Sequence, residues 1–234
     1  VMLEAKYVGV KKFFVVGYDL ETSKLAIEIA SKHEECYAII GFHPTEIKHY
    51  KDEEYKWLEE NAKHPKVVAI GEIGYDFHWD TTTKEEQEQS FIRQIEIAKK
   101  VNLPISIHSR DAIELTLKTL RETNAKIVGG VMHSYSGSKE MAQLFINENF
   151  YLGISGPVTF KNGRVMKEVV EKVDLKYLVT ETDSPYLTPH PFRGKENGSK
   201  YIPLIVEEIA KIKNIHISDV EKQVEKNVFD LFGV

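Results

Sequence analysis

An α/β barrel of the TIM-like (β/α)8 type is the fold that this sequence of 234 residues predicts. Short apolar stretches rich in β-branched residues alternate with longer segments whose apolar residues recur at helical spacing. Such alternation implies parallel strands joined by right-handed helical crossovers. Successive apolar stretches also end roughly 30 residues apart, which is the length of a repeating βα unit.

The predicted strands share a run of apolar residues that stops at a glycine or at a polar residue. In chain order they are Phe13–Gly17, Tyr37–Phe42, Val67–Gly71, Pro104–His108, Ile127–His133, Phe150–Ser155 and Tyr177–Thr182. Pro104 is acceptable because a proline at the first residue of a strand removes no ladder hydrogen bond that the sheet needs.

The predicted helices share apolar residues on one face, such as Phe91, Ile95 and Ala98. They are Glu21–His33, a helix through Tyr55 and Leu58, Glu85–Lys100, Ala112–Glu122, Ser138–Asn147, Val165–Val173, Ile202–Ile212 and Ser218–Phe232. Ser218 is the expected N-cap of the last helix, with Glu221 completing a capping box. The Pro-, Gly- and Asn-rich segment Thr188–Ser199 predicts a loop.

The start of the chain is atypical for this fold. Met2–Val8 has the pattern of the last turns of an amphipathic helix closed by Gly9. A barrel of this type needs eight strands, and an open version with seven would leave two apolar sheet edges. We therefore expect residues 1–234 to form one barrel domain whose first strand precedes Val1. A doubly wound sheet is the alternative, but no glycine-rich dinucleotide fingerprint supports it.

Composition narrows the class of protein. A hydrophobic content of 42% is enough for a sizeable core, and no apolar window is long enough to span a membrane. The formal net charge of −5 argues against a broad basic surface that coats nucleic acid. The single cysteine, Cys36, excludes an internal disulfide, and with no signal-peptide pattern we expect a cytoplasmic protein without membrane contact.

Five predicted strands end in residue types that bind metal ions, and these residues are His43, Glu72, His108, His133 and Asp183. A closed barrel would bring all of its strand ends around one mouth. Imidazole and carboxylate groups with an open coordination position suit a divalent metal that activates water. Glu72, His108, His133 and Asp183 are therefore the predicted metal ligands, although any one histidine alone is more often a hydrogen-bonded core or surface residue.

Several segments resemble the motif series of the TatD-type metal-dependent deoxyribonucleases, within the wider amidohydrolase-like superfamily. They are Gly41–Pro44, Gly71–Asp76, Ile107–Arg110, Met132–Gly137 and Glu181–Leu187. The resemblance implies a TIM-like barrel that hydrolyses DNA phosphodiester bonds with divalent metal ions, and we expect two, of Mg²⁺, Mn²⁺ or Zn²⁺. It matches Glu72, His108, His133 and Asp183 to the metal ligands and His43 to a substrate-binding residue near the scissile phosphate. One departure is that the family's His-x-His pair at the end of the first strand is absent from this sequence.

Two catalytic roles are expected. Asp183 should accept the proton of the attacking water while Glu72 positions the metal ions. Asp183 has an alternative role, in which it caps a turn or pairs with Arg193. Arg110 follows His108 closely enough to bind a phosphate oxygen of the substrate, or it forms an ion pair with Asp111 or Glu114.

The basic loop Phe192–Lys195 could receive a nucleic-acid backbone. Tyr75, Tyr135 and Tyr186 either stack on bases or pack in the core. The predicted function is therefore a 3′-5′ exodeoxyribonuclease acting on single-stranded or frayed DNA ends. An amidohydrolase acting on a small ester, lactone or amide is one alternative, and a non-catalytic binding barrel is the other. The sequence indicates no oligomeric state.

Overall fold

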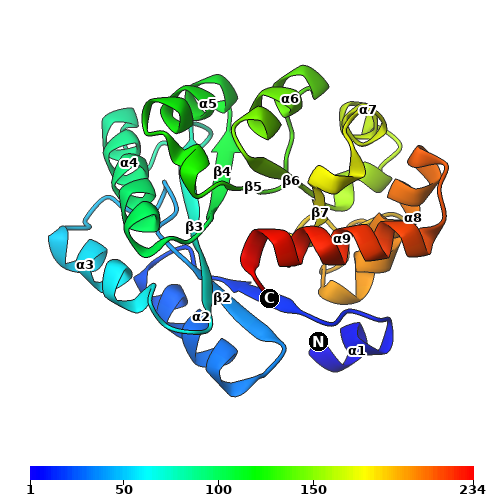
Figure 1. The fold of residues 1–234 in the computed structure, drawn as a ribbon, viewed down its shortest axis with the longest axis horizontal. Coiled ribbons are helices and arrows are strands. Elements are labelled where there is room, and N and C mark those ends of the chain that lie inside the picture. Colours follow the sequence, from blue (N-terminus) through cyan, green and yellow to red (C-terminus); the bar gives the residue numbers. More distant parts are fainter. The chain divides into compact units, whose positions relative to one another are not determined.

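The computed structural model describes all residues 1–234, which form two compact units of helices and parallel strands (Figure 1). The amino-terminal unit consists of Lys12–Met132 and Glu148–Phe150. The carboxy-terminal unit consists of Val1–Lys11, His133–Asn147 and Tyr151–Val234. The expectation of a single domain that begins before Val1 stays a prediction.

A parallel sheet forms the centre of the amino-terminal unit, and each strand pairs with the next one in the chain. Its strands are β1 (Phe13–Val16), β2 (Cys36–Ile40), β3 (Val67–Asp76), β4 (Ile105–Arg110) and β5 (Gly130–Met132). Its helices are α2 (Leu20–Lys32), α3 (Asp52–Asn61), α4 (Lys84–Val101), α5 (Ile113–Glu122) and the 3₁₀ helix η1 (Ala125–Ile127). Each α-helix lies between two strands in the chain, as expected for βα units.

The carboxy-terminal unit contains two parallel strands that pair with each other, β6 (Phe150–Ile154) and β7 (Leu178–Thr180). Of β6, the residues from Tyr151 onward belong to this unit. Its helices are α1 (Met2–Tyr7), α6 (Lys139–Asn147), α7 (Arg164–Lys172), α8 (Ile202–Lys213) and α9 (Ile217–Phe232). Three 3₁₀ helices, η2 (Gly156–Thr159), η3 (Leu175–Tyr177) and η4 (Ser199–Tyr201), connect them. All predicted strands and helices are present, mostly within two residues of their expected ends.

Helix α4 shows how sequence periodicity builds the core. Thr83 caps its first turn by accepting a hydrogen bond from the Glu86 amide, and the Glu86 side chain accepts one from the Thr83 amide. The predicted apolar face of Phe91, Ile95 and Ala98 is buried completely or almost so. Burial of these side chains supplies the apolar contact that holds the helix in place.

Three predicted boundaries are wrong. Strand β5 does not begin at Ile127, because that residue ends η1 and Gly129 then takes a left-handed conformation with φ +64°. Strand β3 does not stop at Gly71 but continues to Asp76, because its later residues pair with β4. Helix α9 is capped by His216, whose side chain accepts a hydrogen bond from the Ser218 amide, so Ser218 lies inside the helix.

No helix of the chain combines the length and the apolar character that crossing a lipid bilayer requires.

Asn227 joins helix α9 to the segment that leads into β7. Its side chain is 1% exposed, and its amide nitrogen donates to the carbonyl oxygens of Leu178 (2.6 Å) and Leu175 (2.8 Å). Asn227→Ala should lower the free energy of unfolding by about 2–4 kcal/mol, because it leaves one buried and one partly buried carbonyl group without this donor. Equilibrium urea unfolding measures the loss. The exposed Glu221→Ala on the same helix should change it by less than about 0.5 kcal/mol, and an equally small change for Asn227→Ala would contradict the assigned role.

Candidate metal centre

The pairing of β3 with β4 places Glu72 close to His108. Gly74 of β3 lies opposite His108 of β4 in the sheet register. The backbone of Gly74 has φ +142°, and a Cβ atom there would collide with the His108 carbonyl oxygen. Glycine is therefore required at position 74, because any side chain would push the two strands apart.

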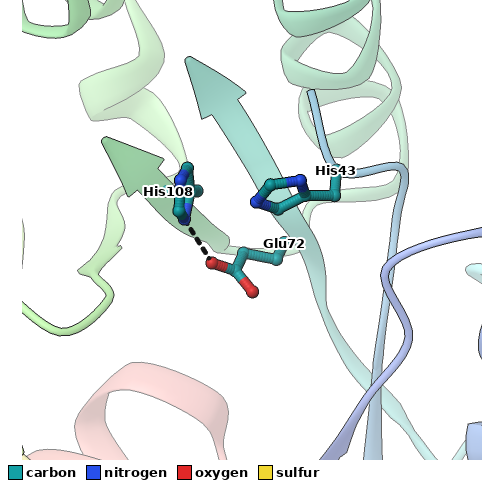
Figure 2. Close-up of side chains that lie close together, drawn as sticks. All are labelled: His43, Glu72 and His108. Atoms are coloured by element: carbon teal, nitrogen blue, oxygen red, sulfur yellow. Dashed lines mark hydrogen bonds and ion pairs between the residues drawn. The ribbon is translucent and has the colours of Figure 1, made fainter. Parts of the chain in front are cut away.

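His108 lies between two carboxylates in the amino-terminal unit. Its Nδ1 is 2.8 Å from Glu72 Oε1, and its Nε2 is 2.9 Å from Asp76 Oδ2. Figure 2 shows the first of these contacts. The Asp76 side chain is 2% exposed, while those of Glu72 and His108 are 17% and 19% exposed. Water therefore screens these charges only in part, which strengthens their interaction.

His43 brings a third possible ligand to the same group. It follows β2, and its ring points toward Glu72 and His108 (Figure 2). The centroids of the His43 and His108 rings are 4.3 Å apart, and Nδ1 of His43 lies 2.7 Å from Thr45 Oγ1, which orients the ring. One ligand atom each from His43, Glu72 and His108 lie within 4.8 Å of one another.

The two carboxylates shift the proton equilibria of this group. Burial alone would lower the pKa of His108, but its hydrogen bonds with Asp76 and Glu72 outweigh this effect and raise the pKa to about 9. Burial would raise the pKa of Asp76, yet its hydrogen bonds with His108 and with the amides of His78 and Trp79 lower it to about 2. A metal ion held by His108 would replace one of its ring protons.

The carboxy-terminal unit contains a second histidine between two carboxylates. His133 Nδ1 is 2.8 Å from Glu181 Oε2, and His133 Nε2 is 3.1 Å from Asp183 Oδ1. The other oxygen of Glu181 accepts a hydrogen bond from the Ser134 amide. A Cβ atom at position 153 would collide with the Glu181 carboxylate, so Gly153 is needed for this carboxylate to lie against β6.

Comparison with known proteins gives the family. Residues 1–233 match the family model described as TatD related DNase. The chain belongs to this TatD family. Among its relatives, the uncharacterized metal-dependent hydrolase YabD of Bacillus subtilis is 43% identical over 234 residues, which cover 100% of this chain and 92% of YabD. The Escherichia coli K12 protein named 3′-5′ ssDNA/RNA exonuclease TatD is 32% identical over 231 residues, which cover 97% of this chain and 89% of that protein.

Solved structures give the same result. The crystal structure of YjjV, a TatD homologue from Escherichia coli K12, matches with a TM-score of 0.93 and 26% identity over 99% of this chain and 90% of that one. A TatD family hydrolase from Entamoeba histolytica matches with a TM-score of 0.87 at 23% identity, over 98% and 87% of the two chains, which supports the fold. The predicted family and the TIM-like α/β fold class are thus confirmed, and the chain is a metal-dependent hydrolase of the TatD family.

The donor atoms suit the divalent metal ions that this TatD family member is expected to use. The first histidine group (His43, Glu72, Asp76 and His108) and the second histidine group (His133, Glu181 and Asp183) both offer imidazole nitrogen and carboxylate oxygen. This combination binds Zn²⁺ and Mn²⁺, and the carboxylates also suit Mg²⁺. Each group also contains two carboxylates, which favour a cation.

Two members of these groups, Asp76 and Glu181, were not among the predicted ligands. They lie in the motif segments Gly71–Asp76 and Glu181–Leu187, in which only Glu72 and Asp183 were predicted to bind metal. Their nearness in sequence to the chosen carboxylates is the signal that could have found them. Asp76 lies four residues after Glu72, and Glu181 lies two residues before Asp183.

Two buried glutamines of α4 fix the segments that carry the first group. The Gln87 side chain accepts from the Asp76 amide and donates to the Asp76 carbonyl, both at 2.9 Å. The Gln94 side chain accepts from the Phe42 amide (2.8 Å) and donates to the Phe42 carbonyl (3.0 Å). Because Phe42 precedes His43, one helix positions the backbone beside two members of the group.

The structure shows which side chains contact some of the remaining predicted site residues. Arg110 is exposed and forms no ion pair with Asp111 or Glu114, and its guanidinium lies 6.0 Å from the centre of the Trp79 ring. Asp183 does not pair with Arg193, whose guanidinium lies 4.5 Å from the centre of the Phe160 ring.

Among the tyrosines, Tyr75 and Tyr135 are buried and hydrogen-bonded, to Thr119 Oγ1 and to the Ser138 carbonyl respectively. They pack in the core and do not stack on bases. Tyr186 is 70% exposed, so its ring remains accessible.

The first group should bind a divalent ion through Glu72. Mn²⁺ titration of metal-free protein, followed by calorimetry, should show binding that Glu72→Gln weakens by at least about tenfold, because the anionic oxygen ligand is lost. Glu85→Gln removes an exposed carboxylate from α4 and serves as the matched control. Equal Mn²⁺ affinity in the wild type and in Glu72→Gln would remove Glu72 from the metal ligands.

Proposed function

We propose that this protein shortens single-stranded DNA from its 3′ end by hydrolysing phosphodiester bonds. In this proposal Glu72, His108, His133 and Asp183 hold divalent metal ions, two in number. The observation that carries it is the pair of histidine groups, each with imidazole and carboxylate donors, in a chain of the TatD family. The 32% identity to the Escherichia coli protein named 3′-5′ ssDNA/RNA exonuclease TatD supports the choice of substrate.

Divalent ions at these residues would act as Lewis acids toward the phosphoryl oxygen and lower the pKa of a bound water molecule. Asp183 is suited to accept the proton of the attacking water, because its side chain is 33% exposed and within reach of solvent. Its Oδ1 faces His133 at 3.1 Å, which fixes the orientation of the carboxylate. Glu72 Oε1 fixes the orientation of the His108 ring in the same way, at 2.8 Å from Nδ1, and both residues would hold the expected ion.

Arg110 and His43 bind the substrate in this proposal. Arg110 lies at the end of β4, two residues after His108, and its guanidinium is not used in an ion pair. A guanidinium can donate two parallel hydrogen bonds to one phosphate group. The His43 ring lies next to His108, where it can donate to a phosphate oxygen or act as a further metal ligand.

A nuclease assay tests this function directly. The protein with Mn²⁺ or Mg²⁺ should shorten a linear single strand labelled at its 5′ end into a ladder and leave a closed circular single strand intact. Asp183→Asn should reduce the rate by about 10²–10⁴, because removing a general base typically costs that much. Chelation of the metal should abolish cleavage in both proteins.

Asp230→Asn is the control, since Asp230 is an exposed partner of Lys226 on α9. It should cleave at the wild-type rate. An Asp183→Asn variant that retains more than about a tenth of the wild-type rate would exclude Asp183 as the general base. Wild-type protein that hydrolyses a lactone or a small amide but no DNA would overturn the nuclease proposal and favour a small-molecule hydrolase.

A further inference from the structure

An exposed tryptophan lies directly after the first histidine group. The loop of residues 77–83 follows β3, which ends at Asp76, and the Trp79 side chain in this loop is 56% exposed. The other tryptophan of the chain, Trp57, is partly buried on α3. A single exposed aromatic ring needs no explanation by itself; the place of Trp79, three residues after Asp76, is what makes it a candidate contact for a ligand of the first histidine group.

Asp76 fixes this loop to the candidate metal ligands. Its Oδ2 faces His108 Nε2 at 2.9 Å, while its Oδ1 accepts hydrogen bonds from the amides of His78 (2.9 Å) and Trp79 (3.3 Å). One buried carboxylate therefore contacts both the ring of His108 and the backbone of Trp79. The backbone that carries the indole is in this way tied to the position of the metal ligands.

The loop is also held from both sides within the amino-terminal unit. The Phe77 amide donates to the Arg110 carbonyl at 3.0 Å, next to the end of β4. The Thr82 hydroxyl donates to the Pro44 carbonyl at 2.7 Å, and Pro44 follows His43. The segments that carry Arg110 and His43 thus border the loop. The loop backbone is preorganised and would lose little conformational entropy on binding a ligand.

Positive charge accompanies the aromatic rings of this loop. The Arg110 guanidinium lies 6.0 Å from the Trp79 ring centre, and the Lys84 ammonium lies 4.7 Å from the Phe77 ring centre. The only acidic side chain between Phe77 and Lys84 is the exposed Asp80. An accessible ring with a cation beside it is the combination that binds single-stranded nucleic acid, because the ring stacks on a base and the cation binds the backbone.

We propose that Trp79 and Arg110 form a base-stacking subsite for single-stranded nucleic acid beside the first histidine group. The subsite rests on the proposed nuclease function and gives it a basis for choosing single strands, because a base must leave its duplex partner to stack on Trp79. Stacking does not depend on which base is present, since every base has an aromatic face. The subsite should therefore accept all sequences and discriminate against nucleotides that lack a base.

Binding without cleavage tests the subsite separately from catalysis. The titrant is an oligothymidylate of about ten nucleotides, added to protein in excess chelator. Trp57→Phe is introduced so that Trp79 is the only fluorescent tryptophan. The oligonucleotide should quench Trp79 fluorescence, and an abasic strand of the same length should bind about 5–150-fold more weakly, because it loses the stacking contact.

Binding of fluorescently labelled strands to the variants completes the test. Trp79→Ala should bind oligothymidylate about 5–150-fold more weakly than the wild type does. The ratio of its affinities for oligothymidylate and for the abasic strand should also be smaller than in the wild type. Trp79→Phe should restore most of the affinity, because phenylalanine keeps an aromatic face. Phe229→Ala removes a 60% exposed ring from α9 and should bind like the wild type. Unchanged Mn²⁺ affinity in Trp79→Ala would show that the metal ligands are intact.

The subsite would be overturned if Trp79→Ala bound oligothymidylate with an affinity within about twofold of the wild type, because loss of a stacked base should weaken binding by more than that. Equal binding of abasic and base-carrying strands by the wild type would also overturn it. Failure of the proposed function gives a different result, in which the strand binds through Trp79 but is not cleaved when metal is added. If Trp79→Ala cleaves the strand at the wild-type rate, the proposed subsite is rejected while the proposed nuclease function still stands.

Discussion

The pairing of histidines with carboxylates is the interaction on which the rest of the site depends. His108 contacts Glu72 and Asp76, and His133 contacts Glu181 and Asp183. These side chains are largely shielded from water, so each charge needs a partner close by. Each histidine thereby gains a fixed ring orientation, which a metal ligand requires.

Asp76 extends this interaction into the surrounding fold. Its carboxylate contacts His108 and the loop that carries Trp79, and its backbone is held by Gln87. A single change at Asp76 would therefore disturb a metal ligand and a surface loop together. Helix α4 likewise connects two parts of the site. Gln87 and Gln94 lie seven residues apart on one face of this helix, and each fixes the backbone near the end of a different strand.

Much of this was predictable from the sequence, because apolar runs that end in His43, His108 or Glu72 are local signals. Asp76 was not predicted because its strand was expected to stop at Gly71, whereas sheet pairing carries β3 through Asp76. Glu181 lies inside the predicted strand Tyr177–Thr182, but its contact with His133 depends on the tertiary fold. Burial of Tyr75 and Tyr135 also could not be predicted. It depends on tertiary packing and on hydrogen bonds to Thr119 and Ser138, and a sequence window contains no such information about packing.

The central claim is that Glu72 and His108 are metal ligands rather than a closed ion pair. Crystals grown with Mn²⁺ and measured at its absorption edge test this most directly. The account predicts an anomalous peak within about 2.0–2.3 Å of a Glu72 carboxylate oxygen and a His108 nitrogen, with one of the two hydrogen bonds of His108 broken. A map in which His108 keeps both carboxylate contacts and no peak lies beside it would contradict the account.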